Sequence, residues 1–92
     1  MMTDEQINEA ITQATGLWDY PYSNETKRMY DFCSDLNAMH EAEKTLTNAN
    51  MYVMEVQLKY VLSAGEFYFH ATARQRAEAF LRTLGKWEEV QG

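Results

Sequence analysis

The sequence has few of the residues that build metal sites and covalent cross-links. Its 92 residues include one cysteine, one proline and two histidines. The single thiol, Cys33, cannot form an internal disulfide, so we expect the fold not to depend on an oxidising compartment. A zinc-binding helix needs two histidines at positions i and i+4, and His40 and His70 do not have this spacing. We predict no metal site and no cofactor.

Positive charge is also scarce. Eight Lys and Arg residues stand against 14 Asp and Glu residues, which gives a formal net charge of −6. Binding to duplex DNA or RNA needs clustered cations on one face, and an anionic membrane surface needs them as well. The charge therefore argues against both ligands and suits a protein that meets a basic protein surface, or one that meets nothing charged at all.

No apolar run is long enough to cross a membrane. The longest one is interrupted by Glu55, Gln57 and Lys59. The acidic segment Met1–Glu5 lacks the apolar region of a secretory signal. We therefore expect a cytoplasmic protein that forms a single domain over residues 1–92, a length that suits one modest core.

Apolar and aromatic residues are well represented. The hydrophobic fraction is 46%, and six Tyr, four Phe and two Trp residues supply apolar surface for a core. Two capping boxes mark the starts of helices, because Thr3 with Gln6 and Thr72 with Gln75 have the required spacing. The helices predicted from these boxes cover residues 4–15 and 73–85.

A further helix is predicted over 35–46, with Ser34 as its N-cap. Its apolar residues share one arc of the helix, and Glu43 falls inside this arc. A buried carboxylate needs a partner, and Arg76 borders the apolar stripe of the last helix. We therefore expect Glu43 to pair with Arg76.

Residues 48–62 fit two structures. Apolar residues alternate with Glu55, Gln57 and Lys59, which is a strand pattern and slightly favours a β-hairpin over 52–70. Thr47, however, is a suitable N-cap, and Glu55 and Lys59 have the i, i+4 spacing of a helical ion pair. The residues alone leave both the helix and the hairpin open.

Residues 17–33 form a long connection rich in aromatic side chains. Pro21 favours an extended Tyr20, and no helical or strand period is sustained. Such a connection is either functional or held in place by its rings. Its rings and cations could stack on a base and hold its phosphate, could form a protein-binding patch, or could simply complete the core.

Two segments resemble a family of small phage and prophage proteins. They are Asp35–Lys44, which reads DLNAMHEAEK, and Ala71–Trp87, which reads ATARQRAEAFLRTLGKW. The resemblance implies a helix over 48–62, although a looser similarity to phage α/β-sandwich domains keeps the hairpin as the alternative. We therefore expect a mainly α domain of about four helices, with residues 66–70 extended.

The phage resemblance implies an accessory role against a host defence system. No nucleophile–base pair is evident, and we interpret Cys33 as a small packed side chain or a plain surface thiol and not as a nucleophile, so we expect no enzymatic activity. We predict stoichiometric binding to a host defence protein in the host cytoplasm. The alternatives are sequestration of a small nucleotide signal and a structural role in the virion, and a homo-oligomer is compatible with each. The predicted binding residues are Trp18, Tyr20, Tyr22, Arg28, Tyr30, Arg74 and Arg76.

Overall fold

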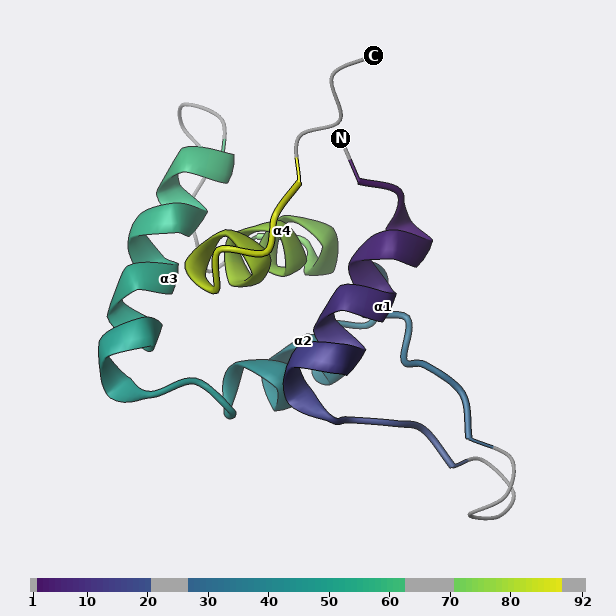
Figure 1. Cartoon of the computed structure of the whole chain (residues 1–92). Coiled ribbons are helices and arrows are strands. Elements are labelled where there is room, and N and C mark those ends of the chain that lie inside the picture. The colour runs from purple at the N-terminus through teal and green to yellow at the C-terminus, as the bar shows by residue number, and fades with distance from the viewer. Residues whose placement is uncertain (1, 21–26, 63–70, 89–92) are drawn as a thin grey trace.

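Four helices make up the regular structure of the part of the chain that the computed structural model describes, which is residues 2–20, 27–62 and 71–88. The mainly α fold predicted from the sequence is confirmed (Figure 1). In chain order the helices are α1 (Asp4–Thr15), α2 (Leu36–Glu43), α3 (Asn48–Val61) and α4 (Ala73–Thr83).

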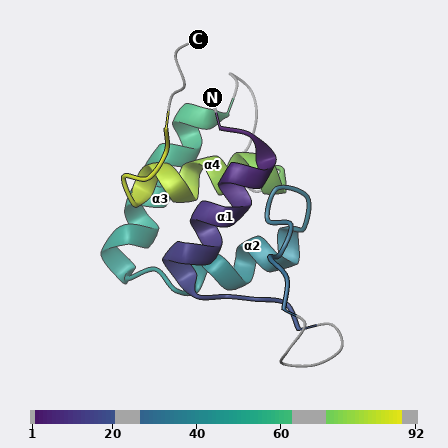
Figure 2. The ribbon, with the colours of Figure 1, turned by 45° about the vertical axis from the view of Figure 1, so that its right-hand side comes forward.

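The last helix, α4, lies at the centre of the fold. The other three helices all pack against it. In Figure 1, α1 and α3 lie on its two sides, and in the turned view α1 crosses in front of it (Figure 2). Four of its residues, Ala77, Ala79, Phe80 and Leu81, are completely buried. The small alanines let neighbouring helices approach closely, while the large side chains fill the space between them.

Threonine residues cap the N-termini of three of the helices, as predicted. The hydroxyl of Thr3 accepts a hydrogen bond from the Gln6 backbone N–H at 3.2 Å, and Thr47 and Thr72 cap α3 and α4 in the same way. Each bond satisfies a backbone donor that has no partner within its helix. Gly16 ends α1 in the left-handed conformation with φ of 72°, which glycine adopts without steric cost.

The second helix is shorter than the predicted range 35–46. Asp35, and not Ser34, is its N-cap and accepts a hydrogen bond from the Ala38 backbone N–H at 3.1 Å. Ser34 instead donates its hydroxyl to Asp31. The helix ends at Glu43, where Thr45 donates its hydroxyl to the Ala42 carbonyl and draws the chain into a tighter turn.

The strand pattern in residues 52–62 is misleading, since residues 52–61 belong to α3. Met54 and Leu58, one turn apart, are buried on the side that packs against α4. This packing outweighs the alternating pattern, so the β-hairpin alternative is wrong over this stretch. Residues 63–70, including the predicted extended segment 66–70, lie outside the described residues.

The described parts of the aromatic connection, 17–20 and 27–33, contain no helix or strand, as expected. Asp19 and Arg28 form an isolated antiparallel bridge through two backbone hydrogen bonds of 2.8 Å. Phe32 is fully buried, and Tyr30 packs against the core with its ring 5.8 Å from that of Phe32. These two rings therefore complete the core.

Candidate functional site

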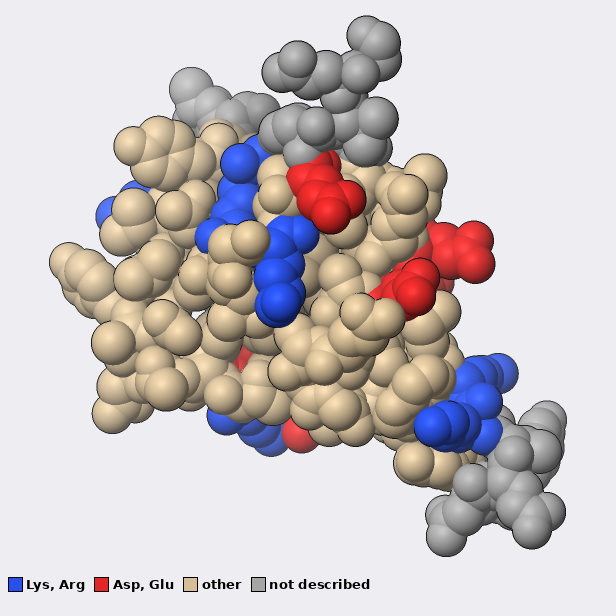
Figure 3. Space-filling view, viewed as in Figure 1, with Lys and Arg blue, Asp and Glu red and all other residues tan. Residues whose placement is uncertain are grey.

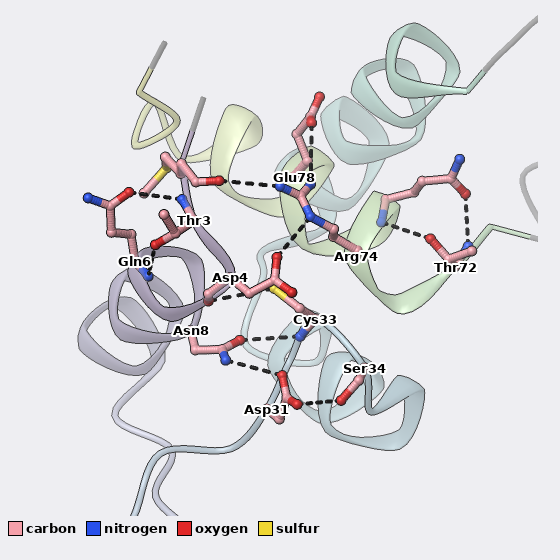
Figure 4. A network of polar contacts seen from close by, with 12 residues as sticks. Thr3, Asp4, Gln6, Asn8, Asp31, Cys33, Ser34, Thr72, Arg74 and Glu78 are labelled. Atoms are coloured by element: carbon pink, nitrogen blue, oxygen red, sulfur yellow. Dashed lines mark hydrogen bonds and ion pairs between the residues drawn. The ribbon is translucent and has the colours of Figure 1, made fainter. Parts of the chain in front are cut away.

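The three arginine residues predicted to bind a ligand each form an ion pair within the chain. Arg74 donates from Nε to Asp4 Oδ1 at 3.0 Å and from Nη2 to the Met2 carbonyl at 3.3 Å (Figure 4). It also lies 4.0 Å from Glu78 Oε1, while Arg82 binds the other oxygen of Glu78 at 3.0 Å. These contacts hold the start of α1 against α4.

The cations of the aromatic segment also contact neighbours from the same segment. Arg28 donates from Nε to Asp19 Oδ2 at 2.8 Å, beside the backbone bridge that joins the same two residues. Lys27 lies over the Trp18 ring, with its Nζ 4.3 Å from the ring centroid. Such a cation–π contact satisfies both groups without an external ligand.

The predicted binding residues that the structure describes lie in separate parts of the fold. Tyr20 is exposed, Tyr30 packs into the core, and Tyr22 lies outside the described residues. Arg74 joins α4 to α1, and Arg76 points to α2. Arg76 and Tyr30 line two different cavities.

Cys33 lies in an environment that opposes nucleophilic chemistry. Its side chain is buried and donates to the Asp4 carbonyl, with Sγ 3.7 Å from the oxygen. Burial, followed by the charge of Asp4, raises the pKa of the thiol from 9.0 to about 12. A reactive cysteine needs the opposite shift, toward the thiolate.

Glu43 and Arg76 form the predicted pair between α2 and α4. Arg76 donates from Nε to Glu43 Oε2 at 3.1 Å and from Nη2 to Oε1, so the two side chains meet in a bidentate arrangement. Only 14% of the Glu43 side chain and 19% of the Arg76 side chain are exposed. A planar guanidinium held by two bonds has a fixed orientation, which makes this pair a rigid wall.

A groove of about 310 Å³ opens beside this pair, between α2, α3 and α4. Four apolar side chains line it: Leu46, Met51, Met54 and Leu58. The polar residues of its lining are His40, Glu43, Glu55 and Arg76. Because Arg76 already binds Glu43, the groove offers a mostly apolar surface with excess negative charge from Glu55.

Of the predicted binding residues that the structure describes, only Arg76 lines this groove. The pairing of Glu43 with Arg76 was the signal that could have located it, because a partly buried ion pair between two helices marks where they meet. The methionines gave no signal, since apolar residues at helical spacing are usually core residues.

Comparison with protein-family models, curated proteins and solved structures finds no match to this chain. Within the described ranges, no three His, Cys, Asp or Glu side chains gather in a cluster that could hold a metal ion. None of the described helices is long and apolar enough to cross a membrane.

Proposed function

We propose that this protein acts without catalysis, by binding one partner protein through the groove between α2, α3 and α4. The observation that carries the proposal is the apolar groove itself, with Met51 at its mouth at 49% exposure. Its volume of about 310 Å³ is near the low end of known ligand pockets, about 300 Å³. A groove of this size suits one or two anchoring side chains of a partner.

The chemistry of the lining indicates which side chain the partner offers. Methionine is flexible and polarisable, so Met51 and Met54 can adjust around an aromatic or branched apolar group. An acidic anchor would be repelled by Glu55, and the Arg76 guanidinium is already held by Glu43. The partner therefore contributes a bulky apolar anchor with no acidic group beside Glu55, as at the central positions of protein interfaces.

The resemblance to small phage proteins supports a host defence protein as this partner and the host cytoplasm as the place of action. Sequestration of a nucleotide has less support, because phosphate binding needs available cations. Arg28, Arg74 and Arg76 each bind a carboxylate of the same chain.

The experiment compares two lysine variants, Met51→Lys and Tyr20→Lys. The two parent side chains are 49% and 48% exposed, so both changes place a cation on the surface with a similar effect on folding. Each variant is expressed in a panel of host strains that each carry one defence system. We expect the unmodified protein to restore phage plaques in one of these strains.

In that strain, Met51→Lys should abolish plaque formation and capture of the defence protein, while Tyr20→Lys should leave both unchanged. Circular dichroism establishes that each variant is folded. Equal activity of the folded Met51→Lys variant would exclude the groove as the binding site. Failure to restore plaques in any strain would argue against the role in counteracting defence.

A further inference from the structure

The side of α3 that faces away from α4 exposes large apolar residues. We call this surface the outer face of α3, and it consists of Tyr52, Val53, Val56 and Tyr60. Tyr52 is 71% exposed and Tyr60 is 81% exposed. In Figure 3 the surface over α3, on the left of the view, is mostly free of charged residues. An isolated apolar residue on a surface is common, but a contiguous set on one helix face marks a contact site.

Two opposite charges flank the outer face on the same side. At about 100° per residue, Lys59 is about 60° from Val56 around the helix, and Glu55 is about 100° away in the same direction. The two residues have the i, i+4 spacing expected of an ion pair, yet neither belongs to an ion pair within the described residues. One acid and one base are therefore available at the edge of an apolar surface.

We propose that the outer face of α3 binds the same face of a second copy of this chain, with the two helices antiparallel. A two-fold axis across the face keeps the charged edges of both copies on one side. If the axis crosses α3 near Gln57, Glu55 of each copy lies opposite Lys59 of the other. Two symmetric ion pairs then close the edge of the interface.

The same register also matches the apolar residues. Val56 meets its own counterpart close to the axis, and Tyr52 falls within about two residues, or about 3 Å of helix rise, of the opposing Tyr60. Their rings can pack together while the hydroxyl groups stay in water at the rim. A parallel arrangement would instead bring the charged edge against Gln57, on the other side of the face, and would leave both charges unpaired.

This self-complementarity favours a second copy over an unrelated partner. A different protein would have to supply its own base and acid in matching order, whereas a two-fold axis supplies them automatically. One helix face is smaller than the roughly 800 Å² per partner of a standard interface, so we expect a dissociation constant in about the micromolar range. Met54 and Leu58 of the groove lie on the opposite side of α3, whereas Glu55 lines the groove as well. Val56 is outside the groove lining, so a substitution there tests this interface separately from the proposed function.

Sedimentation equilibrium tests the proposal, with the unmodified protein studied from about 1 to about 500 µM to bracket a micromolar constant. We expect a reversible monomer–dimer equilibrium. The variant Val56→Glu places two carboxylates together at the axis, and we expect the dissociation constant to rise at least about tenfold. Tyr20→Lys changes the surface of the connection after α1, away from α3, and should leave the equilibrium unchanged.

A charge exchange tests the register. Glu55→Lys alone places two ammonium groups opposite each other, and Lys59→Glu alone places two carboxylates together, so each should weaken the dimer by about fivefold. The double variant Glu55→Lys with Lys59→Glu restores opposite charges across the axis and should recover the original constant. A monomer at all concentrations, or a dimer insensitive to Val56→Glu, would overturn the proposed interface. A dimer weakened by Val56→Glu but not recovered in the double variant would overturn the antiparallel register.

Discussion

Arg76 holds both carboxylate oxygens of Glu43 and joins α4 to α2, two helices that are 33 residues apart at this contact. Both side chains are mostly shielded from water. Shielding strengthens the attraction between them, but it also makes either charge costly when its partner is removed. The pair therefore contributes to the position of α2 on the core as well as to the wall of the groove.

Removing the charge of Glu43 should destabilise the fold. Glu43→Gln keeps the size of the side chain but leaves the guanidinium of Arg76 without its counter-ion. We expect a decrease of about 2 kcal/mol in the free energy of unfolding, measured by urea denaturation. The matched control is Lys44→Gln, which removes an exposed ion pair of 2.8 Å with Glu41.

Exposed pairs contribute little, so Lys44→Gln should change the free energy of unfolding by less than about 0.5 kcal/mol. Equal effects of the two substitutions would show that the contact between Arg76 and Glu43 adds no more than a surface pair.

Cys33 should make stability fall at alkaline pH. Because burial raises the pKa of the folded thiol from 9.0 to about 12, the folded state retains a proton that the unfolded chain loses. The contribution of the protonated Cys33 thiol to stability is complete below pH 9 and is lost as the pH rises toward 12. We expect the melting temperature of the unmodified protein to fall more steeply in this range than that of Cys33→Ala.

The difference between the two proteins is the informative quantity, since tyrosines and lysines titrate in the same range in both. The same burial predicts that Cys33 reacts slowly with a thiol reagent at pH 8 until the protein is unfolded. This account would be contradicted if the melting temperatures of the two proteins fell equally with alkaline pH and the native thiol reacted fast.

Asp31 should stabilise the fold at neutral pH and cease to do so in acid. It accepts hydrogen bonds from the hydroxyl of Ser34 and, at 3.2 Å, from the side-chain amide of Asn8 (Figure 4). Both bonds lower the pKa of the Asp31 carboxyl below 3.8, and the bond from Ser34 has the larger effect. Its contribution is therefore complete above pH 3.8 and decreases as the pH falls through the folded-state pKa.

Asp31→Asn removes the charged acceptor. We expect it to lower the free energy of unfolding at pH 7 by up to about 1 kcal/mol, a small effect because the site is exposed to water. Chemical denaturation of both proteins at pH 7 and at pH 3 measures how the difference between their free energies of unfolding changes with pH. A difference between the two proteins that is as large in acid as at neutral pH would show that the stabilisation does not come from the carboxylate.

Helix positions could be predicted where local chemistry determines them. Thr3 and Thr72 begin capping boxes, and a few residues are enough to satisfy the backbone donors of the first turn. The pairing of Glu43 with Arg76 could also be predicted, because each residue interrupts an apolar stripe. In α3 the alternating sequence favoured a strand, and the resemblance to phage proteins was needed to select the helix.

The contacts made by the predicted binding residues could not be predicted in this way. Arg74 is an attractive anion ligand in the sequence, but Asp4, 70 positions away, reaches it only in the folded chain. The groove likewise combines side chains from three helices and the loop after α2, and no local pattern distinguishes a groove methionine from a core methionine. Exposure of Tyr52 and Tyr60 depends on which side of α3 meets α4, which only the packing shows.

The central place of α4 has a consequence for the synthesis of the protein. All three earlier helices pack against a helix that begins at Ala73, so ribosomes must translate most of the chain before the core can close. Until then the apolar sides of α1, α2 and α3 lack their main packing partner and are open to chaperones and proteases. A nascent chain arrested before Ala73 should therefore remain protease-sensitive, and protection should appear only once α4 has emerged from the ribosome.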